Sequence, residues 1–495
     1  MSLRIKCLEI DTYGENVAYL SRDCTLYRPE EFLGLNKIEI TGGNGKTILA
    51  TLNVVEDKRL LAPDQLGLST CAFRRLGVKC DAKVKITPAT PPASMEHVRG
   101  KVNGEAITAQ GFRAIIDDIA RWRYSKMEIA TFLIACASFM TVEEIYHLTV
   151  AMAEAGTIID WKQKPIVDKH CVGGLPGNRT SMIVVPIVAA YGLMMPKTSS
   201  RAITSPAGTA DTMEMLANVN LGIDEMKKVV KKTNGCMVWG GKVNLSPADD
   251  IMIAVERPLA IDTPEQMVAS IISKKIAAGS THLVLDIPVG ATAKVRSRKE
   301  AMRLRKLFEH LAKRTGLVVD VVITDGTQPV GRGIGPVLEA RDIMAILEGK
   351  PEGLRDLEER GLMLAGRILE FDAKLPGGEG YETAKRILES GQALAAMNAI
   401  IDAQGRAKKQ IKPGSRTYEV LAARGGAVKS IDCWRMARIA RAAGAPLFPG
   451  AGVDLLKKTG EQVKKGGALY RIHAEMRSDF DLAKRMADEN SGFSL

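Results

Sequence analysis

A glycine-rich loop holds the first residues whose types and spacing can do chemistry. Residues 169–181 read KHCVGGLPGNRTS, and an apolar helix is expected over 180–191. Small residues let backbone N–H groups approach an anion at the start of a helix, while Lys169, Thr180 and Ser181 add a positive charge and hydroxyl donors. The pattern favours an anion-binding loop over one whose glycines serve only tight packing.

A second loop is rich in hydroxyl groups. Residues 198–211 read TSSRAITSPAGTAD, with six hydroxyls and one guanidinium between Thr198 and Thr209. The guanidinium of Arg201 can bind two oxygens of a phosphate at once, so this loop is predicted to wrap a phosphate group. A third glycine-rich loop, residues 324–335, is predicted to be structural.

An acidic residue, Asp262, precedes a helix that Thr263 and Pro264 are expected to start. Ser270 and Lys274 are four residues apart and therefore share a face of this helix. A carboxylate beside the first turn is stabilised by the helix dipole, so Asp262 can be a helix-start residue with no chemical role. The residues alone leave this interpretation and a catalytic one equally open.

One stretch of the N-terminal region resembles a nucleotide-binding loop without having its spacing. Gly42–Thr47 reads GGNGKT, but the motif G-x4-G-K-[ST] requires a glycine where the chain has Ile40. Asn44 and Gly45 lie between two β-type runs, which is a strong signal for a hairpin turn. We therefore predict a β-hairpin here.

The elements that must position these loops fall into several domains. Short alternating runs bounded by turns predict strands, whereas apolar residues at three- and four-residue spacing predict helices. Together they predict a multidomain α/β protein. Its parts are a β-rich domain over 1–85, a helical lobe over 86–160 rejoined by about 246–279, a large α/β lobe with a mixed sheet over 161–245 and 280–412, and a C-terminal α/β module over 413–495.

Composition indicates a globular protein. The longest apolar stretch, residues 182–195, contains Pro186 and is shorter than the roughly 18 residues that a membrane span needs. The N-terminal residues lack the apolar segment of a signal peptide, so a cytoplasmic location and no membrane partner are expected. Eight scattered cysteines, with no C-x-x-C pair and no zinc spacing to the six histidines, predict reduced thiols and no structural zinc.

The net charge suggests nucleic-acid binding as an alternative. The chain has 69 Lys and Arg against 57 Asp and Glu, a net charge of +12 over 495 residues. These basic residues are spread along the chain, and the densest run, Lys227 to Lys232, has the helical spacing of a solvated face. The same positive field would steer small anionic substrates. We therefore expect no nucleic-acid partner.

Several stretches carry a resemblance to a known family. They read VDKHCVGG at 167–174, SSRAITSPAGTADTME at 199–214, LSPADD at 245–250 and SIISKKIAAG at 270–279. With them the chain resembles the thymidine/pyrimidine-nucleoside phosphorylase family (nucleoside phosphorylase II) over about residues 95–495. The resemblance implies a pentosyltransferase with a helical lobe, a large α/β lobe, an active cleft between them, and a homodimer.

Within this family the chain is similar to the archaeal AMP phosphorylases. The pyrimidine branch usually has serine where Cys171 stands, and it reads the base with tyrosine and arginine where this chain has Ile253–Glu256. The additional β-rich domain points to the same branch. The resemblance implies phosphorolysis of AMP, and also of CMP and UMP, to a free base and ribose 1,5-bisphosphate in nucleotide salvage.

Two alternatives stay open. One is a thymidine or pyrimidine nucleoside phosphorylase, and the other, of a different class, is a basic nucleic-acid-binding or scaffolding protein. The β-rich domain is expected to serve assembly beyond the dimer, because strand edges in such a domain must be paired or covered.

The resemblance also implies roles for individual residues. It makes Asp262 the proton donor and implies no metal or organic cofactor. Nucleotide contacts are implied for Gly174, Ser200, Arg201, Ala202, Ile203, Thr204, Ser205, Thr209, Ser270 and Lys294. Orthophosphate contacts, matched from the pyrimidine branch, are implied for Lys169, Ser181, Ser199 and Thr209.

Overall fold

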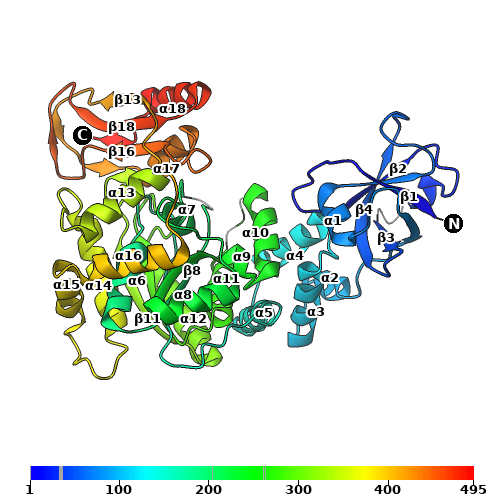
Figure 1. Cartoon of the computed structure of the whole chain (residues 1–495), viewed down its shortest axis with the longest axis horizontal. Helices are drawn as coiled ribbons and strands as arrows, with labels where there is room; N and C mark the ends of the chain where they lie inside the picture. Colours follow the sequence, from blue (N-terminus) through cyan, green and yellow to red (C-terminus); the bar gives the residue numbers. More distant parts are fainter. Residues whose placement is uncertain (1, 33–36, 203–204, 260, 262) are drawn as a thin grey trace. The chain divides into compact units, whose positions relative to one another are not determined.

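The computed structural model describes residues 2–32, 37–202, 205–259, 261 and 263–495. The chain forms two compact units, each built from separate stretches of sequence. The first unit consists of Met1–Gly156 and Ser246–Ser270, and the second of Thr157–Leu245 and Ile271–Leu495. Their elements confirm the expected multidomain α/β class (Figure 1).

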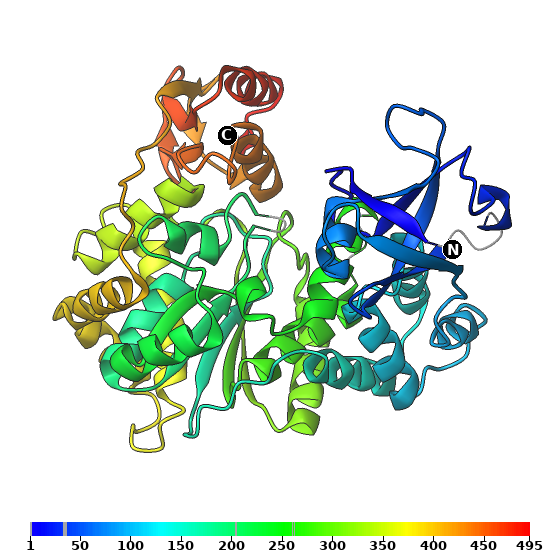
Figure 2. The same ribbon diagram turned by 45° about the vertical axis from the view of Figure 1, so that its right-hand side comes forward.

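The first unit begins with a closed β-barrel, drawn in blue in Figure 2. Its strand order is β1-β5-β2-β4-β3-β6, and β6 pairs with β1 to close the ring. Closure pairs both edges of each of these described strands within the barrel itself, so none of these strands offers an open edge to a partner subunit. The elements are β1 (Leu3–Cys7), β2 (Val17–Ser21), β3 (Lys37–Gly42), β4 (Thr47–Val55), β5 (Gln65–Leu68), α1 (Thr70–Leu76) and β6 (Lys83–Pro88).

Strands β3 and β4 form the hairpin that the sequence predicts. The two strands pair in antiparallel register, and the N–H of Gly42 donates to the carbonyl of Lys46 at 2.9 Å. Gly45 has a φ of 76°, which is a conformation that favours glycine. Ile38 and Ile40 point into the fully buried barrel core, whereas Glu39 between them is exposed. The hairpin is confirmed.

The barrel packs against helices of its own unit. Lys37 at the start of β3 donates to the carbonyl of Arg123 at 2.8 Å and forms a buried ion pair with Glu128. Arg75 on α1 lies 3.6 Å from the ring centre of Trp122. A buried ion pair and a cation–π contact therefore fix the barrel on the helical lobe.

The helical lobe is assembled from two parts of the chain. Helix α10 packs against α3, α4 and α5, although about 90 residues of the second unit separate it from them in sequence. Its described helices are α2 (Met95–Val102), α3 (Ala109–Ala120), α4 (Lys126–Ser138), α5 (Val142–Glu154) and α10 (Pro247–Leu259). Helix α11 (Pro264–Ala277) begins in this unit and ends in the other.

A buried ion pair stabilises the lobe. Lys101 Nζ lies 2.7 Å from Glu144, and both side chains are buried. Burial alone would raise the pKa of Glu144, but bonds from Lys101 and from the backbone of Thr141 and Ile107 lower that pKa. Glu144 also completes a capping box with Thr141 at the start of α5.

The second unit is built around parallel strands. β7 (Val167–Cys171), β10 (His282–Val289) and β11 (Val318–Asp325) pair in parallel, as do β8 (Met195–Ser199) and β9 (Gly235–Trp239). A parallel bridge between Ile166 and Met194 joins the two groups. The expectation of a mixed sheet is therefore wrong for these strands. Their connections contain helices, and such crossovers return the chain in the same direction.

Helices cover both faces of these strands. Neighbouring side chains on a strand point to opposite faces, and Met237 belongs to one core cluster while Cys236 and Val238 belong to another. The first cluster packs against α6, α13, α14, α15 and α16, and the second against α8 and the end of α11. The helices are α6 (Ser181–Tyr191), α7 (Thr209–Glu214), α8 (Ile223–Thr233), α9 (Gly240–Val243), α12 (Arg298–Thr315), α13 (Pro336–Leu347), α14 (Arg355–Leu369), α15 (Gly380–Glu389) and α16 (Gln392–Gln404).

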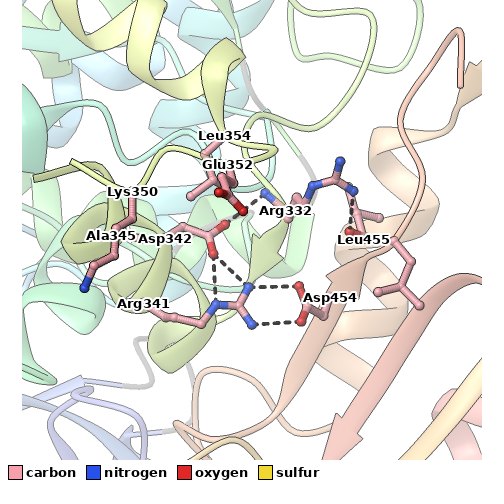
Figure 3. A pocket seen from close by; sticks show the side chains of 10 residues that line it. Arg332, Arg341, Asp342, Ala345, Lys350, Glu352, Leu354, Asp454 and Leu455 are labelled. Atoms are coloured by element: carbon pink, nitrogen blue, oxygen red, sulfur yellow. Dashed lines mark hydrogen bonds and ion pairs between the residues drawn. The ribbon is translucent and has the colours of Figure 1, made fainter. Parts of the chain in front are cut away.

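The C-terminal part adds an antiparallel sheet of order β12-β16-β18-β13. Strand β12 lies within the third glycine-rich loop and pairs with β16, so this loop is tied directly to the C-terminal sheet. Arg341 on α13 strengthens the junction by binding both carboxylate oxygens of Asp454 on β16, at 2.8 and 2.9 Å (Figure 3). The elements are β12 (Gly333–Ile334), β13 (Arg416–Leu421), β14 (Gly426–Ala427), β15 (Ser430–Ile431), α17 (Cys433–Ala442), β16 (Gly452–Leu455), β17 (Gln462–Val463), β18 (Ala468–Ala474), α18 (Arg477–Glu489) and β19 (Phe493–Ser494).

In the described part of the chain, every helix is too short or too polar to cross a membrane.

A buried charge cluster joins the strands to α11. Asp168 on β7 lies 2.6 Å from Lys275 of α11 and 3.3 Å from Lys197 of β8. All three side chains are buried. Burial lowers the pKa of Lys275 from 10.5 to about 7, with a further lowering by Lys197 that the carboxylate of Asp168 only partly offsets.

We expect Lys275→Met to change how stability depends on pH. Between pH 7 and 10.5 the unfolded chain binds a proton that folded Lys275 has lost. The stability of the wild type should therefore rise with pH across this window, by at most about 1.4 kcal/mol per pH unit. Thermal unfolding from pH 7 to about 9 should show a steeper rise in the wild type than in Lys275→Met, in which other buried lysines such as Lys169 still contribute. Lys274→Met is the matched control and should keep the rise, and an equal rise in all three proteins would contradict the prediction.

Candidate functional site

The glycine-rich loops of the second unit all follow the carboxyl ends of parallel strands. The first loop leaves β7, the second leaves β8 and the third leaves β11, while the segment with Lys294 leaves β10. Because the paired strands β7, β10 and β11 run parallel, their carboxyl ends lie at one edge, and ligands of α/β sheets bind at such an edge. This edge is the candidate site.

Lys169 lies on β7 and is almost completely buried, with 1% of its surface exposed. Its Nζ donates to Thr180 Oγ1 at 2.6 Å, and burial lowers the pKa of the ammonium group. Ser181, the first residue of α6, is also buried. The structure therefore brings Lys169 and Ser181, two of the expected orthophosphate residues, to one helix start.

The hydroxyl of Ser199 is a buried polar group whose hydrogen bonding the described residues leave unsatisfied. Ser199 ends β8, and its Oγ is buried without a hydrogen-bond partner among the residues that the structure describes. A buried hydroxyl without a partner is costly, so such a group is expected to bind a ligand or a water molecule. Thr209, the remaining orthophosphate residue, begins α7 at the end of the same loop.

Gly174 and Lys294 lie against each other. A Cβ atom at Gly174 would lie 2.6 Å from the Cβ of Lys294, and the φ of Gly174 is 80°. Both the space and the backbone conformation therefore require glycine at this position. Gly174 and Lys294, two expected nucleotide-binding residues, are neighbours in the structure.

Arg201 is already bound to carboxylates. Its guanidinium lies 2.6 Å from Glu214 and 3.1 Å from Asp211, and it stacks over the ring of Trp239 at 5.0 Å. The hydrogen bonds that Arg201 donates to Glu214, and then the one that it donates to Asp211, raise its pKa. A phosphate at this position would have to share or replace these acidic partners.

Asp211 also organises the rest of the second loop. One oxygen of its carboxylate accepts from the N–H of Ala202 at 2.7 Å and from that of Gly208 at 2.8 Å. Gly208 packs tightly, since a Cβ there would lie 2.5 Å from the carbonyl of Ser200. The hydroxyl of Ser205 donates to the carbonyl of Ala207 at 2.6 Å. Ile203 and Thr204, which the resemblance also implies, lie outside the described residues.

For two further expected site residues, the structure gives no contact with this edge of the sheet. Asp262, the expected proton donor, lies outside the described residues. Ser270 lies half-buried on α11 and belongs to the first unit.

His170 and Cys171 lie beside Lys169 on β7. Burial, followed by the nearby charges of Lys275 and Lys197, lowers the pKa of His170 well below 6.5, so its imidazole is neutral near pH 7. Burial raises the pKa of the Cys171 thiol to about 12. Neither side chain supplies a charge for anion binding at neutral pH.

The structure adds residues that the sequence analysis did not single out. Asn178 donates to the thiol of Cys171 at 3.2 Å and to the fully buried carboxylate of Asp286 at 3.3 Å. Arg179 forms a buried ion pair with Glu339 at 2.5 Å. Arg179 belongs to the first loop, but partners more than 100 residues away carry no local signal in the sequence.

The third loop packs directly against the first. The N–H of Val330 donates to the carbonyl of Pro176 at 3.1 Å, and a Cβ at Gly177 would lie 2.0 Å from the carbonyl of Val330. Gly177 has a φ of 75°, so this close approach needs glycine. These contacts agree with the structural role that the sequence analysis expects for this loop.

Comparison with protein families finds matches for three parts of the chain, beginning at residue 95. Residues 95–156 match the model described as "Glycosyl transferase family, helical bundle domain", and residues 163–394 match "Glycosyl transferase family, a/b domain". Residues 427–494 match "Pyrimidine nucleoside phosphorylase C-terminal domain".

Whole-length relatives extend this finding. A protein of Rhodopseudomonas palustris named "Putative thymidine phosphorylase" is 56% identical over 100% of this chain and 96% of its own length. A protein of the same name from Methylococcus capsulatus is 54% identical, also over 100% of this chain and 96% of its own. The crystal structure of anthranilate phosphoribosyltransferase from Thermus thermophilus covers 63% of this chain and 99% of its own, with a TM-score of 0.53 and 20% identity, a likeness of fold alone. The chain belongs to the thymidine/pyrimidine nucleoside phosphorylase family.

Proposed function

We propose that this protein is a phosphorylase of nucleoside 5′-monophosphates. It cleaves the N-glycosidic bond of AMP, and of CMP and UMP, with orthophosphate, and it releases the free base and ribose 1,5-bisphosphate in nucleotide salvage. The observation that carries the phosphorolytic part is the buried hydroxyl of Ser199 in the hydroxyl-rich second loop, which has no hydrogen-bond partner among the described residues. A tetrahedral oxyanion supplies the acceptors that such a hydroxyl lacks.

The reaction needs two groups of residues. Lys169, Ser181, Ser199 and Thr209 hold orthophosphate, whose oxygen forms a bond to C1′ of the ribose as the C1′–N bond breaks. The electron pair of that bond goes to the departing base, which must be protonated. We assign this proton to Asp262, whose pKa must be raised in the substrate complex because the start of a helix lowers it.

The preference for a nucleotide rests on two features of the sequence. Ile253–Glu256 lie within α10 and replace the tyrosine and arginine with which the pyrimidine branch reads its base. Gly174 and Lys294, implied as nucleotide contacts, lie together in the structure.

Thymidine or pyrimidine nucleoside phosphorolysis is the second candidate. The names of the bacterial relatives favour it, since both are called "Putative thymidine phosphorylase". The carboxylates of Asp211 and Glu214 also favour it, because they already bind the guanidinium of Arg201 that a 5′-phosphate would need.

A direct assay separates these functions. We expect purified protein with orthophosphate to release adenine from AMP faster than it releases the base from adenosine or thymidine, measured by chromatography. Release from thymidine without release from AMP would establish the second candidate, and release from adenosine alone would contradict both candidates. If no base is released from any of the three substrates, both functions are wrong, and the basic binding or scaffolding protein becomes the remaining alternative.

We also propose that the protein acts in the cytoplasm as a homodimer or larger homo-oligomer, with the N-terminal barrel serving assembly. The first unit supports this proposal with an exposed apolar surface. Met127 and Ile134 on α4 and the following Phe139 and Val142 are all exposed. Large apolar side chains that are exposed in one region of a protein are candidates for a protein–protein interface, and these four lie on α4, after it and at the start of α5.

We expect Asp262→Asn to lower kcat on AMP by about 10²–10⁴-fold, the usual value of a positioned general acid. Binding of AMP should change little, because the substitution keeps the size of the side chain. His170→Asn is the matched control and should cost less activity, since the imidazole of His170 is already neutral. Steady-state kinetics on both variants would show the roles to be reversed if only His170→Asn abolished turnover.

We expect Arg201→Ala to raise the KM for AMP by about 10- to 100-fold, as for loss of a charge-assisted contact worth ~1.5–3 kcal/mol. Any weak activity on adenosine should be largely unchanged. Glu214→Gln is the control, because it removes an acidic competitor for Arg201 and should leave the KM for AMP equal or lower. Equal losses on AMP and adenosine in Arg201→Ala would mean that Arg201 shapes the loop or binds orthophosphate instead.

A further inference from the structure

A buried ion pair lies where the three glycine-rich loops meet. Arg179 of the first loop and Glu339 of α13 are 160 residues apart in sequence, and their side chains are 10% and 1% exposed. The Nε of Arg179 lies 2.5 Å from Glu339 Oε2. The pair is neither at the surface nor among the residues that the resemblance assigns to substrate.

Arg179 connects the first loop to the second. One Nη of its guanidinium donates to the carbonyl of Ala207 at 2.5 Å and to the hydroxyl of Ser205 at 3.4 Å. The carbonyl of Arg179 accepts from the N–H of Met182 at 2.9 Å, in the first turn of α6. A single residue therefore fixes both the start of α6 and the loop that leads into α7.

Glu339 holds the other side of the junction. Its carboxylate accepts from Thr212 Oγ1 on α7 at 3.0 Å and from the N–H of Gly335 at the end of the third loop at 3.2 Å. The ion pair thus reaches both helix starts that carry expected orthophosphate residues, Ser181 on α6 and Thr209 on α7.

We propose that Arg179 and Glu339 are positioning residues that set the distance between Ser181 and Thr209 and thereby the affinity for orthophosphate. This inference rests on the proposed function, because it concerns the orthophosphate site of that reaction. Neither residue needs to touch the anion. Their effect passes through Ala207 and Thr212, which they hold directly.

The alternative is that the pair only stabilises the fold, and the two roles have different consequences. Removing one partner of a buried ion pair leaves an uncompensated charge and lowers stability, whereas replacing both partners by apolar residues of similar size is often neutral. Positioning behaves differently, because the carbonyl of Ala207 loses the guanidinium of Arg179 in the double variant as well and keeps the hydroxyl of Ser205, which belongs to the same loop and cannot tie it to the first loop. Stability can therefore recover while phosphate binding does not.

The test compares Arg179→Met, Glu339→Met and the double variant with the wild type. Calorimetric titration with inorganic phosphate alone gives the Kd without requiring turnover, and thermal unfolding gives stability. Lys101→Met is the matched control, because it removes one partner of an equally buried ion pair in the first unit.

We expect each single variant to raise the phosphate Kd by about 10- to 100-fold, the range found when residues that orient metal ligands are removed. The double variant should regain most of the lost unfolding temperature and keep the weakened Kd. Lys101→Met should unfold at a lower temperature with an unchanged Kd. A wild-type Kd in Arg179→Met, or full recovery of the Kd in the double variant, would overturn the positioning role alone. Absence of phosphate binding by the wild type would overturn this inference together with the proposed function.

Discussion

The carboxylate of Asp168 is the interaction on which the candidate site depends. It is buried on β7, directly before Lys169, and it binds one lysine from β8 and one from α11. It also accepts from the backbone N–H of Lys169 at 2.7 Å. Lys169 on β7 and Ser199 at the end of β8 are among the residues proposed to hold orthophosphate. The side chain of Asp168 therefore fixes the two strands from which the first and second loops begin, together with the last turn of α11.

The charge balance of this cluster has consequences nearby. Two lysines face one carboxylate, so their combined charge exceeds that of Asp168 when both are protonated. Burial is the main reason that the pKa of Lys275 falls and that the imidazole of His170 is neutral, and the neighbouring lysine charges lower both pKa values further. A short distance along β7, the buried ammonium of Lys169 adds to the same positive potential. An anion at the edge of the sheet is the natural complement of such a region.

Local patterns in the sequence predicted the local structure well. The Asn44–Gly45 turn predicted the hairpin of β3 and β4, and the glycine-rich loops predicted the strand ends near which several of the expected site residues lie. Such local patterns could not predict contacts between residues that are far apart in the sequence. Closure of the barrel depends on pairing of β1 with β6, and the partner of Arg179 is 160 residues away.

The sequence also could not show that a charged side chain was already engaged. Arg201 stands among hydroxyls in the loop, which favours phosphate binding, yet Asp211 and Glu214 come within reach only when the chain turns into α7. The parallel direction of the strands follows from connections that contain helices. The sequence analysis did not single out β8 and β9 as strands, so it could not predict their parallel pairing.

The interrupted course of the helical lobe affects how the protein is made. A ribosome releases the barrel and helices α2 to α5 first, but α10 emerges only after about 90 further residues that belong to the other unit. Until then, the faces of α3, α4 and α5 that α10 covers are open to solvent. The nascent chain must therefore keep an incomplete lobe soluble while part of the second unit is synthesised, a period in which chaperones have apolar surface to bind.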